Sequence, residues 1–171
     1  KGLFEDNGME LPADLWDRDE WDFQHFYDAA RMLTMDTDRD GQIDQIGCTT
    51  WMYTMFNVAN GAKTISVTDT GIELTWNDPK YIEGLEWMIK CYPYAKVQTD
   101  KWYSGKAAMY AERLSDSSHW AKEVSFDWDW VPYPKGPSGY GYEGYCGPAG
   151  GSLTCFVGTG AKNIEGAKVF I

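Results

Sequence analysis

The chemistry of this chain is concentrated in one acidic stretch, residues 36–47, which reads Asp-Thr-Asp-Arg-Asp-Gly-Gln-Ile-Asp-Gln-Ile-Gly. Carboxylates stand at positions 1, 3, 5 and 9 of this stretch and a glycine at position 6. Ca²⁺ prefers about six to eight oxygen ligands, which alternating side chains of a tight loop can supply, and the glycine permits the sharp turn. The expected ligands are Asp36, Asp38, Asp40, Asp44 and the backbone carbonyl of Gln42.

The stretch departs from a complete EF-hand loop at its last position. Position 12 is Gly47, so the bidentate glutamate is missing. Either Asp44 takes the bidentate role, helped by Gln45, or a carboxylate arrives from elsewhere in the protein. The alternative is an acidic, solvated turn without metal. Four aspartates within nine residues repel one another unless a cation neutralises them, which favours the metal site.

Three helices are expected around this loop. Apolar residues recur at helical spacing after Asp22, a good N-cap, and predict an amphipathic helix that ends where the loop begins. A second helix is expected to begin at Thr49 or Thr50 and to end at residues 60–61. A third begins at Asn77. Its expected core side consists of Ile82, Leu85, Trp87 and Ile89.

Several short strands are expected between and after these helices. Segments 64–67 and 72–76 alternate apolar and polar residues around a Thr-Asp-Thr-Gly turn, which predicts a β-hairpin. Further strands are expected at 107–110, 127–131 and 152–157, with loop at 132–151 and a last helix from Asn163. Helices interspersed with short strands predict an α/β fold, and 171 residues correspond to one domain.

Composition excludes some classes of function. The chain has 15 basic and 26 acidic residues, a net charge of −11, and no basic cluster that would neutralise phosphates, so nucleic acid is not an expected partner. The sequence contains no H-E-x-x-H, no G-x-S-x-G and no phosphate-binding glycine loop, so we do not expect an enzyme. Its four cysteines lack the spacing of a zinc or redox motif. They are either buried thiols or, for Cys146 and Cys155, a disulfide bridge.

A second signal is the aromatic content, nine tryptophans and eleven tyrosines, which exceeds what one core requires. Flat aromatic faces pack against sugar rings, while a few placed polar groups bind the hydroxyls. Trp51 follows the acidic loop closely and is a candidate, whereas Trp76 and Trp87 fit the core better. Glu112 and Arg113 follow an expected strand and could bind hydroxyls, or could form a surface salt bridge.

The order of several segments gives a resemblance. A helix that ends in residues 29–34 runs into the aspartate loop and Asp-Gln-Ile-Gly, and segments 3–12 and 20–23 precede it. Gly-Lys-Ala-Ala-Met-Tyr follows at 105–110, then Trp-Val-Pro-Tyr-Pro-Lys-Gly-Pro at 130–137, a glycine pair at 150–151 and the closing segment 161–171. In this order the segments resemble the extracellular solute-binding proteins, family 1, of carbohydrate ABC transporters.

The resemblance implies an α/β lobe of a type II periplasmic-binding-protein-like fold, with residues 1–171 as a single domain excised from a two-lobe receptor. It implies binding of a sugar or oligosaccharide in an interlobe cleft, without catalysis. The residues expected at the ligand are Thr50, Trp51, Glu112, Arg113, Trp120, Gly150 and Gly151. In the family, the region of Trp51 lines the cleft, an aromatic at the place of Trp120 stacks on the ligand, and the glycine pair approaches it.

The same resemblance implies a monomer that delivers its ligand to ABC permease subunits in the membrane. It also implies an extracellular or periplasmic location, with lipoprotein anchoring of the full-length protein. The alternative from the residues themselves is a stand-alone, calcium-stabilised carbohydrate-binding module. Such a module would share the metal loop and the aromatic richness, but we would expect it to be all-β.

Overall fold

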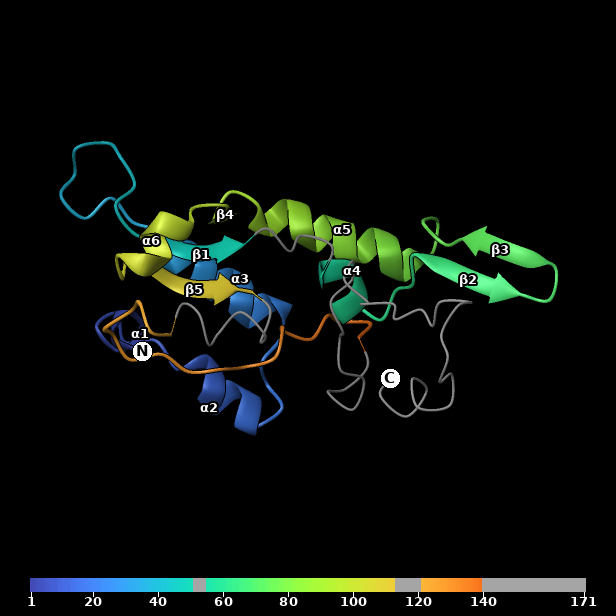
Figure 1. Cartoon of the computed structure of the whole chain (residues 1–171), viewed down its shortest axis with the longest axis horizontal. Coiled ribbons are helices and arrows are strands. Elements are labelled where there is room, and N and C mark those ends of the chain that lie inside the picture. Colours follow the sequence, from blue (N-terminus) through green and yellow to red (C-terminus); the bar gives the residue numbers. More distant parts are fainter. Residues whose placement is uncertain (51–54, 113–120, 140–171) are drawn as a thin grey trace, which may run out of the picture.

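The computed structural model describes residues 1–50, 55–112 and 121–139 as a mixed α/β structure. Its elements surround a small parallel sheet, and a separate antiparallel hairpin extends from one end (Figure 1). The elements in chain order are α1 (Gly2–Glu5), α2 (Pro12–Asp17), α3 (Phe23–Met32), β1 (Ile46–Thr50), α4 (Met55–Ala59), β2 (Ile65–Thr68), β3 (Gly71–Leu74), α5 (Pro79–Cys91), β4 (Ala95–Lys96), α6 (Thr99–Tyr103) and β5 (Ala107–Ala111).

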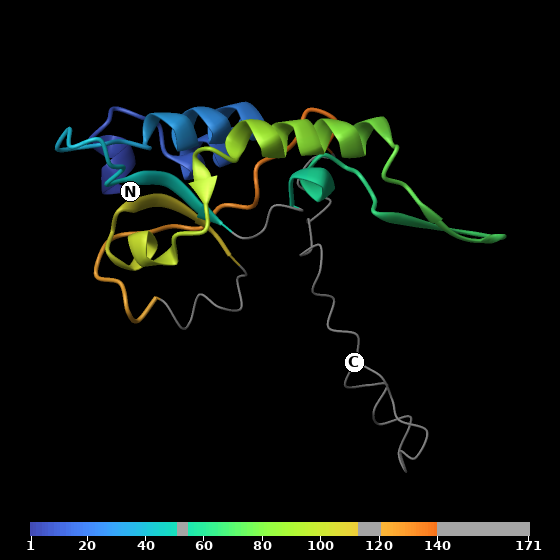
Figure 2. The same cartoon turned by 90° about the horizontal axis from the view of Figure 1, so that it is seen from above.

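The sheet has three parallel strands in the order β4-β1-β5. Helices α3 and α5 run along one side of it and α6 lies on the other, as Figure 2 shows. The expected strand at 107–110 is confirmed as β5, but the central strand β1 replaces the predicted helix start at Thr49 or Thr50. All five residues of β1 are buried, so the strand lacks the alternation by which a half-exposed strand is recognised.

The two long helices follow their capping residues. In α3 the predicted N-cap is confirmed, because the Asp22 carboxylate accepts the His25 N–H at 2.9 Å. Helix α5 begins one residue later than predicted, with Asp78 rather than Asn77 as its N-cap. Its predicted core side is wrong in part, since Ile82 and Ile89 are 46% and 66% exposed.

The core side of α5 is set by a close approach to α4. Gly84 and Cys91 are buried there, and Trp87 and Met88 pack against the main core cluster. A Cβ at Gly84 would lie 2.8 Å from the Cα of Asn57, so only glycine allows the two helices this spacing. The apolar periodicity of α5 does not reveal this contact, because a glycine adds nothing to a hydrophobic pattern.

The predicted hairpin is confirmed as the antiparallel pair β2 and β3, with Ile65 opposite Leu74 and Val67 opposite Ile72. These four aliphatic side chains share one face of the ribbon, because residues two apart on a strand point the same way. Val67 and Ile72 are 78% and 71% exposed. The hairpin extends beyond the end of α5 in both views (Figures 1 and 2), so its apolar face is not part of the described core.

Residues 132–136 form an irregular segment that lies beside Trp21. Trp21 fixes this segment, since its indole N–H donates to the Pro132 carbonyl at 3.0 Å and its own carbonyl accepts the Lys135 N–H at 3.2 Å. Trp21 is only 2% exposed and belongs to the core. The prediction of a strand at 127–131 is wrong, because these residues have no regular secondary structure. The predicted strand at 152–157 and helix from Asn163 lie outside the described residues.

Candidate functional site

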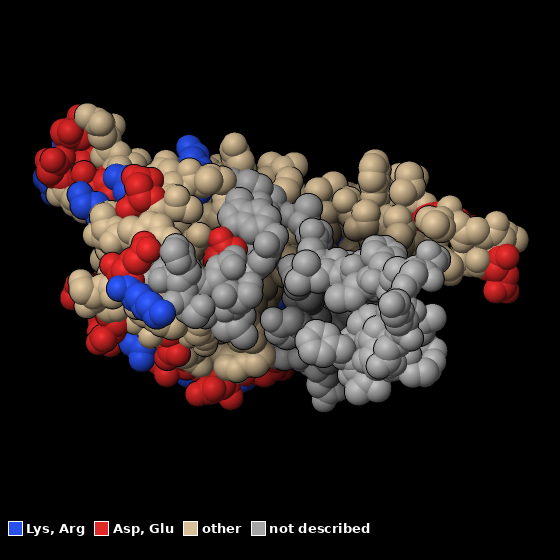
Figure 3. Space-filling view, viewed as in Figure 1, with Lys and Arg blue, Asp and Glu red and all other residues tan. Residues whose placement is uncertain are grey.

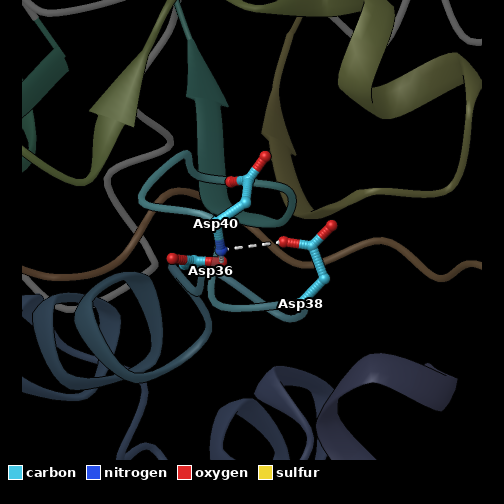
Figure 4. A group of neighbouring side chains, drawn as sticks. All are labelled: Asp36, Asp38 and Asp40. Carbon is cyan, nitrogen blue, oxygen red and sulfur yellow. Dashed lines mark hydrogen bonds between the residues drawn. The ribbon is translucent and has the colours of Figure 1, made fainter.

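The acidic loop leaves the end of α3, projects from the body and returns as β1 (Figure 1). Asp36, Asp38 and Asp40 each offer a carboxylate oxygen, and these oxygens lie within 4.8 Å of one another (Figure 4). Carboxylates at this spacing are close enough to bind one cation together. Figure 3 shows the acidic side chains gathered at the exposed end of this loop. The three aspartates predicted at positions 1, 3 and 5 are thus brought together.

Backbone amides of the loop hold the carboxylates in place. Asp36 accepts the Arg39 N–H on Oδ1 at 2.6 Å and the Gly41 N–H on Oδ2 at 2.8 Å. Asp38 Oδ1 accepts the Asp40 N–H at 3.1 Å (Figure 4). Gly41 has a φ of +91°, a conformation that a glycine adopts at little cost, so the predicted sharp turn at position 6 is present.

Asp44, the fourth expected carboxylate, is hydrogen-bonded to the opposite end of the loop. Its Oδ2 accepts the Thr37 N–H at 2.9 Å and the Thr37 hydroxyl at 2.7 Å. The hydrogen bond from the Thr37 hydroxyl is the main reason that the pKa of the Asp44 carboxyl lies below its ordinary value. Within the described residues, Asp44 is not part of the carboxylate group formed by the other three aspartates. It closes the loop by joining its two ends.

Gln45 does not turn towards the carboxylates. Its side chain is buried and its Nε2 donates to the Leu33 carbonyl at 3.0 Å, at the end of α3. Backbone pairing between Met35 and Gln45 forms the base of the loop. Lys101 of α6 adds a further anchor, since its Nζ donates to the Asp44 carbonyl at 3.0 Å. The loop is therefore fixed at its base by protein groups, while its tip holds the carboxylates.

The structure explains why position 12 is a glycine. Gly47 lies inside β1, and a Cβ built on it would stand 1.9 Å from the carbonyl oxygen of Ala30 in α3. Its N–H donates to the Thr34 hydroxyl at 2.9 Å. No glutamate fits here, because the residue that would carry it is pressed against a helix backbone. The loop joins a helix to a strand rather than a helix to a helix.

Two of the predicted ligand-binding residues lie in the described part of the chain. Thr50 ends β1 and Glu112 directly follows β5, and the parallel register sets Thr50 beside Ala111. Both residues are therefore at the carboxyl edge of neighbouring strands. The other five lie outside the described residues: Trp51, Arg113, Trp120, Gly150 and Gly151.

Sequence reasoning missed the aromatic support beneath this edge. The Tyr110 hydroxyl donates to Glu112 Oε2 at 2.9 Å, and its ring packs against Trp102 with 5.4 Å between centroids. The available signal was the Tyr-Ala-Glu order itself, since residues two apart on a strand share a face. Of the tryptophans expected in the core, Trp87 packs against it, but Trp76 is 53% exposed.

The described cysteines are structural. Cys48 and Cys91 are free and buried, and burial raises the pKa of each thiol to about 12. Both thiols are therefore protonated at neutral pH and poor as nucleophiles or metal ligands. The suggested pair Cys146 and Cys155 lies outside the described residues.

Comparison with known proteins adds no assignment: no protein-family model matches the chain, and no curated protein matches it significantly. Among the described residues, no helix is both long enough and apolar enough to cross a bilayer.

Proposed function

We propose that this chain forms one lobe of the solute receptor of a carbohydrate ABC importer, with a type II periplasmic-binding-protein-like fold. The observation that supports this most is that Thr50 and Glu112 stand where two neighbouring parallel strands, β1 and β5, end at the same carboxyl edge of the sheet. In open α/β sheets, ligands bind outside the carboxyl ends of the strands. The mixed α/β fold also argues against the all-β carbohydrate-binding module.

In this proposal a sugar lies against the carboxyl edge and is bound without chemical change. The Glu112 carboxylate accepts hydrogen bonds from hydroxyls, and charge-assisted bonds of this kind are the stronger class. Trp51 and Trp120 supply stacking faces, while Arg113 and the glycine pair at 150–151 complete the contacts. The second lobe of an intact receptor closes over the sugar. The receptor then delivers the sugar to permease subunits at the outer face of the membrane.

The chain with half of such a cleft should bind oligosaccharides weakly, with a Kd of about 1 mM or higher. We expect titration of the ¹⁵N-labelled chain with maltotriose, cellotriose or xylotriose to shift the amide NMR signals of residues 49–50 and 110–112. Glu112→Ala should abolish these shifts, while Glu86→Ala, which changes an exposed residue of α5, should preserve them.

Two results would contradict this function. Shifts confined to another surface, or no shift with any of the three sugars at about 50 mM, would remove the carboxyl edge as the ligand site. Submicromolar binding would show that the described edge is not half of a shared cleft.

The proposed role of the acidic loop is to bind a structural Ca²⁺. Three carboxylates and an exposed position correspond to the affinity of extracellular calcium modules, with a Kd of about 0.1–1 mM. The ion would neutralise charges that otherwise repel one another between the end of α3 and the start of β1. The Gln42 carbonyl and water molecules would complete the coordination.

We expect 10 mM Ca²⁺ to stabilise the folded chain by about 1.4–2.7 kcal/mol and to raise its melting temperature by about 3–10 °C. Asp38→Asn should remove most of this rise, because it removes one of the three carboxylate charges that bind the ion. The asparagine keeps an oxygen that can accept the Asp40 N–H, so the loop itself should not be disturbed. Without Ca²⁺ the same variant should melt no lower than the unmodified chain.

The control is Asp69→Asn, which removes one carboxylate charge from the exposed hairpin turn and should leave the Ca²⁺ effect intact. Differential scanning calorimetry in EDTA, Mg²⁺ and Ca²⁺ measures all three proteins. Identical melting curves of the unmodified chain in EDTA and in 10 mM Ca²⁺ would show that the loop is an acidic turn without metal.

A further inference from the structure

The hairpin of β2 and β3 has an apolar face that the other described residues leave open. Ile65, Val67, Ile72 and Leu74 have exposed fractions of 48–78%. Trp76, two residues beyond Leu74, continues this face towards the base of the hairpin and is also exposed. None of the five belongs to, or packs against, a core cluster of the described residues. Contiguous exposed apolar patches mark surfaces that associate with a partner.

The hairpin has no third strand to support it in the described sheets. Its two four-residue strands pair only with each other there. A two-stranded ribbon alone is marginally stable in water, and a further layer or further strands are needed to stabilise it. On the opposite face of β2, Ser66 and Thr68 are less exposed than their apolar neighbours. The apolar face is therefore the side of the hairpin that requires a partner.

Charges of opposite sign stand at the two ends of the apolar face. The Thr75 N–H donates to the Thr64 carbonyl at 3.2 Å, so the strand pairing continues to the base. Lys63 is exposed there, two residues before Ile65 and on the same face. Asp69 is exposed in the turn at the tip. Neither charge is paired with another described residue.

We propose that the apolar hairpin faces of two copies of this chain pack against each other in an antiparallel, two-fold symmetric dimer. Asp69 at the tip of one hairpin then lies beside Lys63 at the base of the other, and the symmetry forms this pair twice. A parallel arrangement would set like charges together. The acidic loop projects from the end of the molecule remote from the hairpin, so the acidic loops of the two copies stay apart (Figures 1 and 3).

The size of the face sets the strength of this dimer. With the exposed fractions of the five apolar side chains, the two faces together bury roughly 700–1,000 Å². Interfaces of this size are weak and reversible, so we expect a dimer Kd of about 0.1 mM. The assembly differs from the monomer that the resemblance implies, and it does not depend on the proposed sugar ligand.

The first test is sedimentation equilibrium of the chain from about 10 µM to 1 mM, which spans the expected Kd. Val67→Lys places a charge in the middle of the apolar face and should weaken the dimer at least about 10-fold. Ser66→Lys is the matched control, because it adds the same charge to the opposite face of β2, across from Glu73, and should preserve the dimer. A monomeric unmodified chain, or equal association of Val67→Lys, would overturn the proposal.

The second test exchanges the two charges. Lys63→Glu or Asp69→Lys alone should weaken the dimer by about 3- to 10-fold, because each sets like charges together twice. The double variant should restore association, since each copy then supplies both exchanged partners. A double variant as weak as the single ones would overturn the antiparallel arrangement.

Other occupants of the face give different results. A chain that stays monomeric up to about 1 mM and sediments with phosphatidylcholine vesicles would show that the face binds a lipid surface. A monomeric chain whose melting temperature falls in Val67→Lys but not in Ser66→Lys would show that the chain covers the face itself. Either result would overturn the dimer.

Discussion

Gly47→Ala should destabilise the folded chain by about 3 kcal/mol or more. The added methyl group would stand 1.9 Å from the Ala30 carbonyl oxygen, a backbone atom that cannot rotate away. Helix α3 and strand β1 would have to separate, and their contact is part of the main core. Urea denaturation followed by tryptophan fluorescence gives the free energy of unfolding.

The matched control is Gly2→Ala, because a Cβ at Gly2 meets no atom within 4 Å. It should change the free energy of unfolding by no more than about 0.5 kcal/mol. Equal stability of Gly47→Ala and the unmodified chain would show that α3 and β1 are not packed as described.

Gly47→Glu tests whether the same close contact prevents a complete EF-hand loop from forming. It completes the twelve-residue EF-hand pattern in sequence, yet we expect it to unfold the chain rather than to tighten Ca²⁺ binding. The glutamate would start from a strand position pressed against α3, not from a helix that follows the loop. Higher Ca²⁺ affinity in a folded Gly47→Glu protein would contradict the helix-to-strand geometry.

Asn60→Ala is expected to cost about 2–4 kcal/mol. The Asn60 side chain is fully buried, and its Nδ2 donates to the Lys80 carbonyl at 2.8 Å and to Glu83 Oε2 at 2.7 Å. Its Oδ1 accepts the Ser138 N–H at 2.9 Å. One amide therefore joins the end of α4, the first turns of α5 and the segment after 132–136. Alanine would remove this partner from three part-buried groups.

Thermal and urea unfolding measure this loss. Asn77→Ala is the control, since Asn77 is exposed and precedes the N-cap of α5. The control should lie within about 0.5 kcal/mol of the unmodified chain. A similarly small effect of Asn60→Ala would mean that water replaces the amide, and that residues 136–139 are held by other contacts.

The elements that could be predicted from sequence are those set by local signals. Helix α3 has a capping aspartate and a regular apolar face, and the hairpin has alternating strands around a short turn. Strand β1 could not be predicted in this way. The strand is buried along its whole length, so it shows no alternation of apolar and polar residues. It also contains Gly47, which lets α3 pack closely but has a low strand propensity.

In the candidate site, too, the features set by local spacing were predictable from sequence and those set by tertiary contacts were not. The close approach of Asp36, Asp38 and Asp40 follows from alternate positions on one turn, which sequence spacing expresses directly. The partners of Asp44 and Gln45 depend on where the loop base is anchored, and spacing carries no information about that. The placement of Thr50 and Glu112 at one edge of the sheet depends on the parallel register of two strands distant in sequence.

The strand order β4-β1-β5 has a consequence for synthesis of the chain. The central strand is made first, and its parallel neighbours follow about 50 residues later, which takes several seconds at about 5–20 residues per second on the ribosome. During that time β1 can already pack against α3, the helix made just before it. The contact of Gly47 with Ala30 lies between these two segments, so the nascent chain can cover one face of its central strand before either neighbour exists.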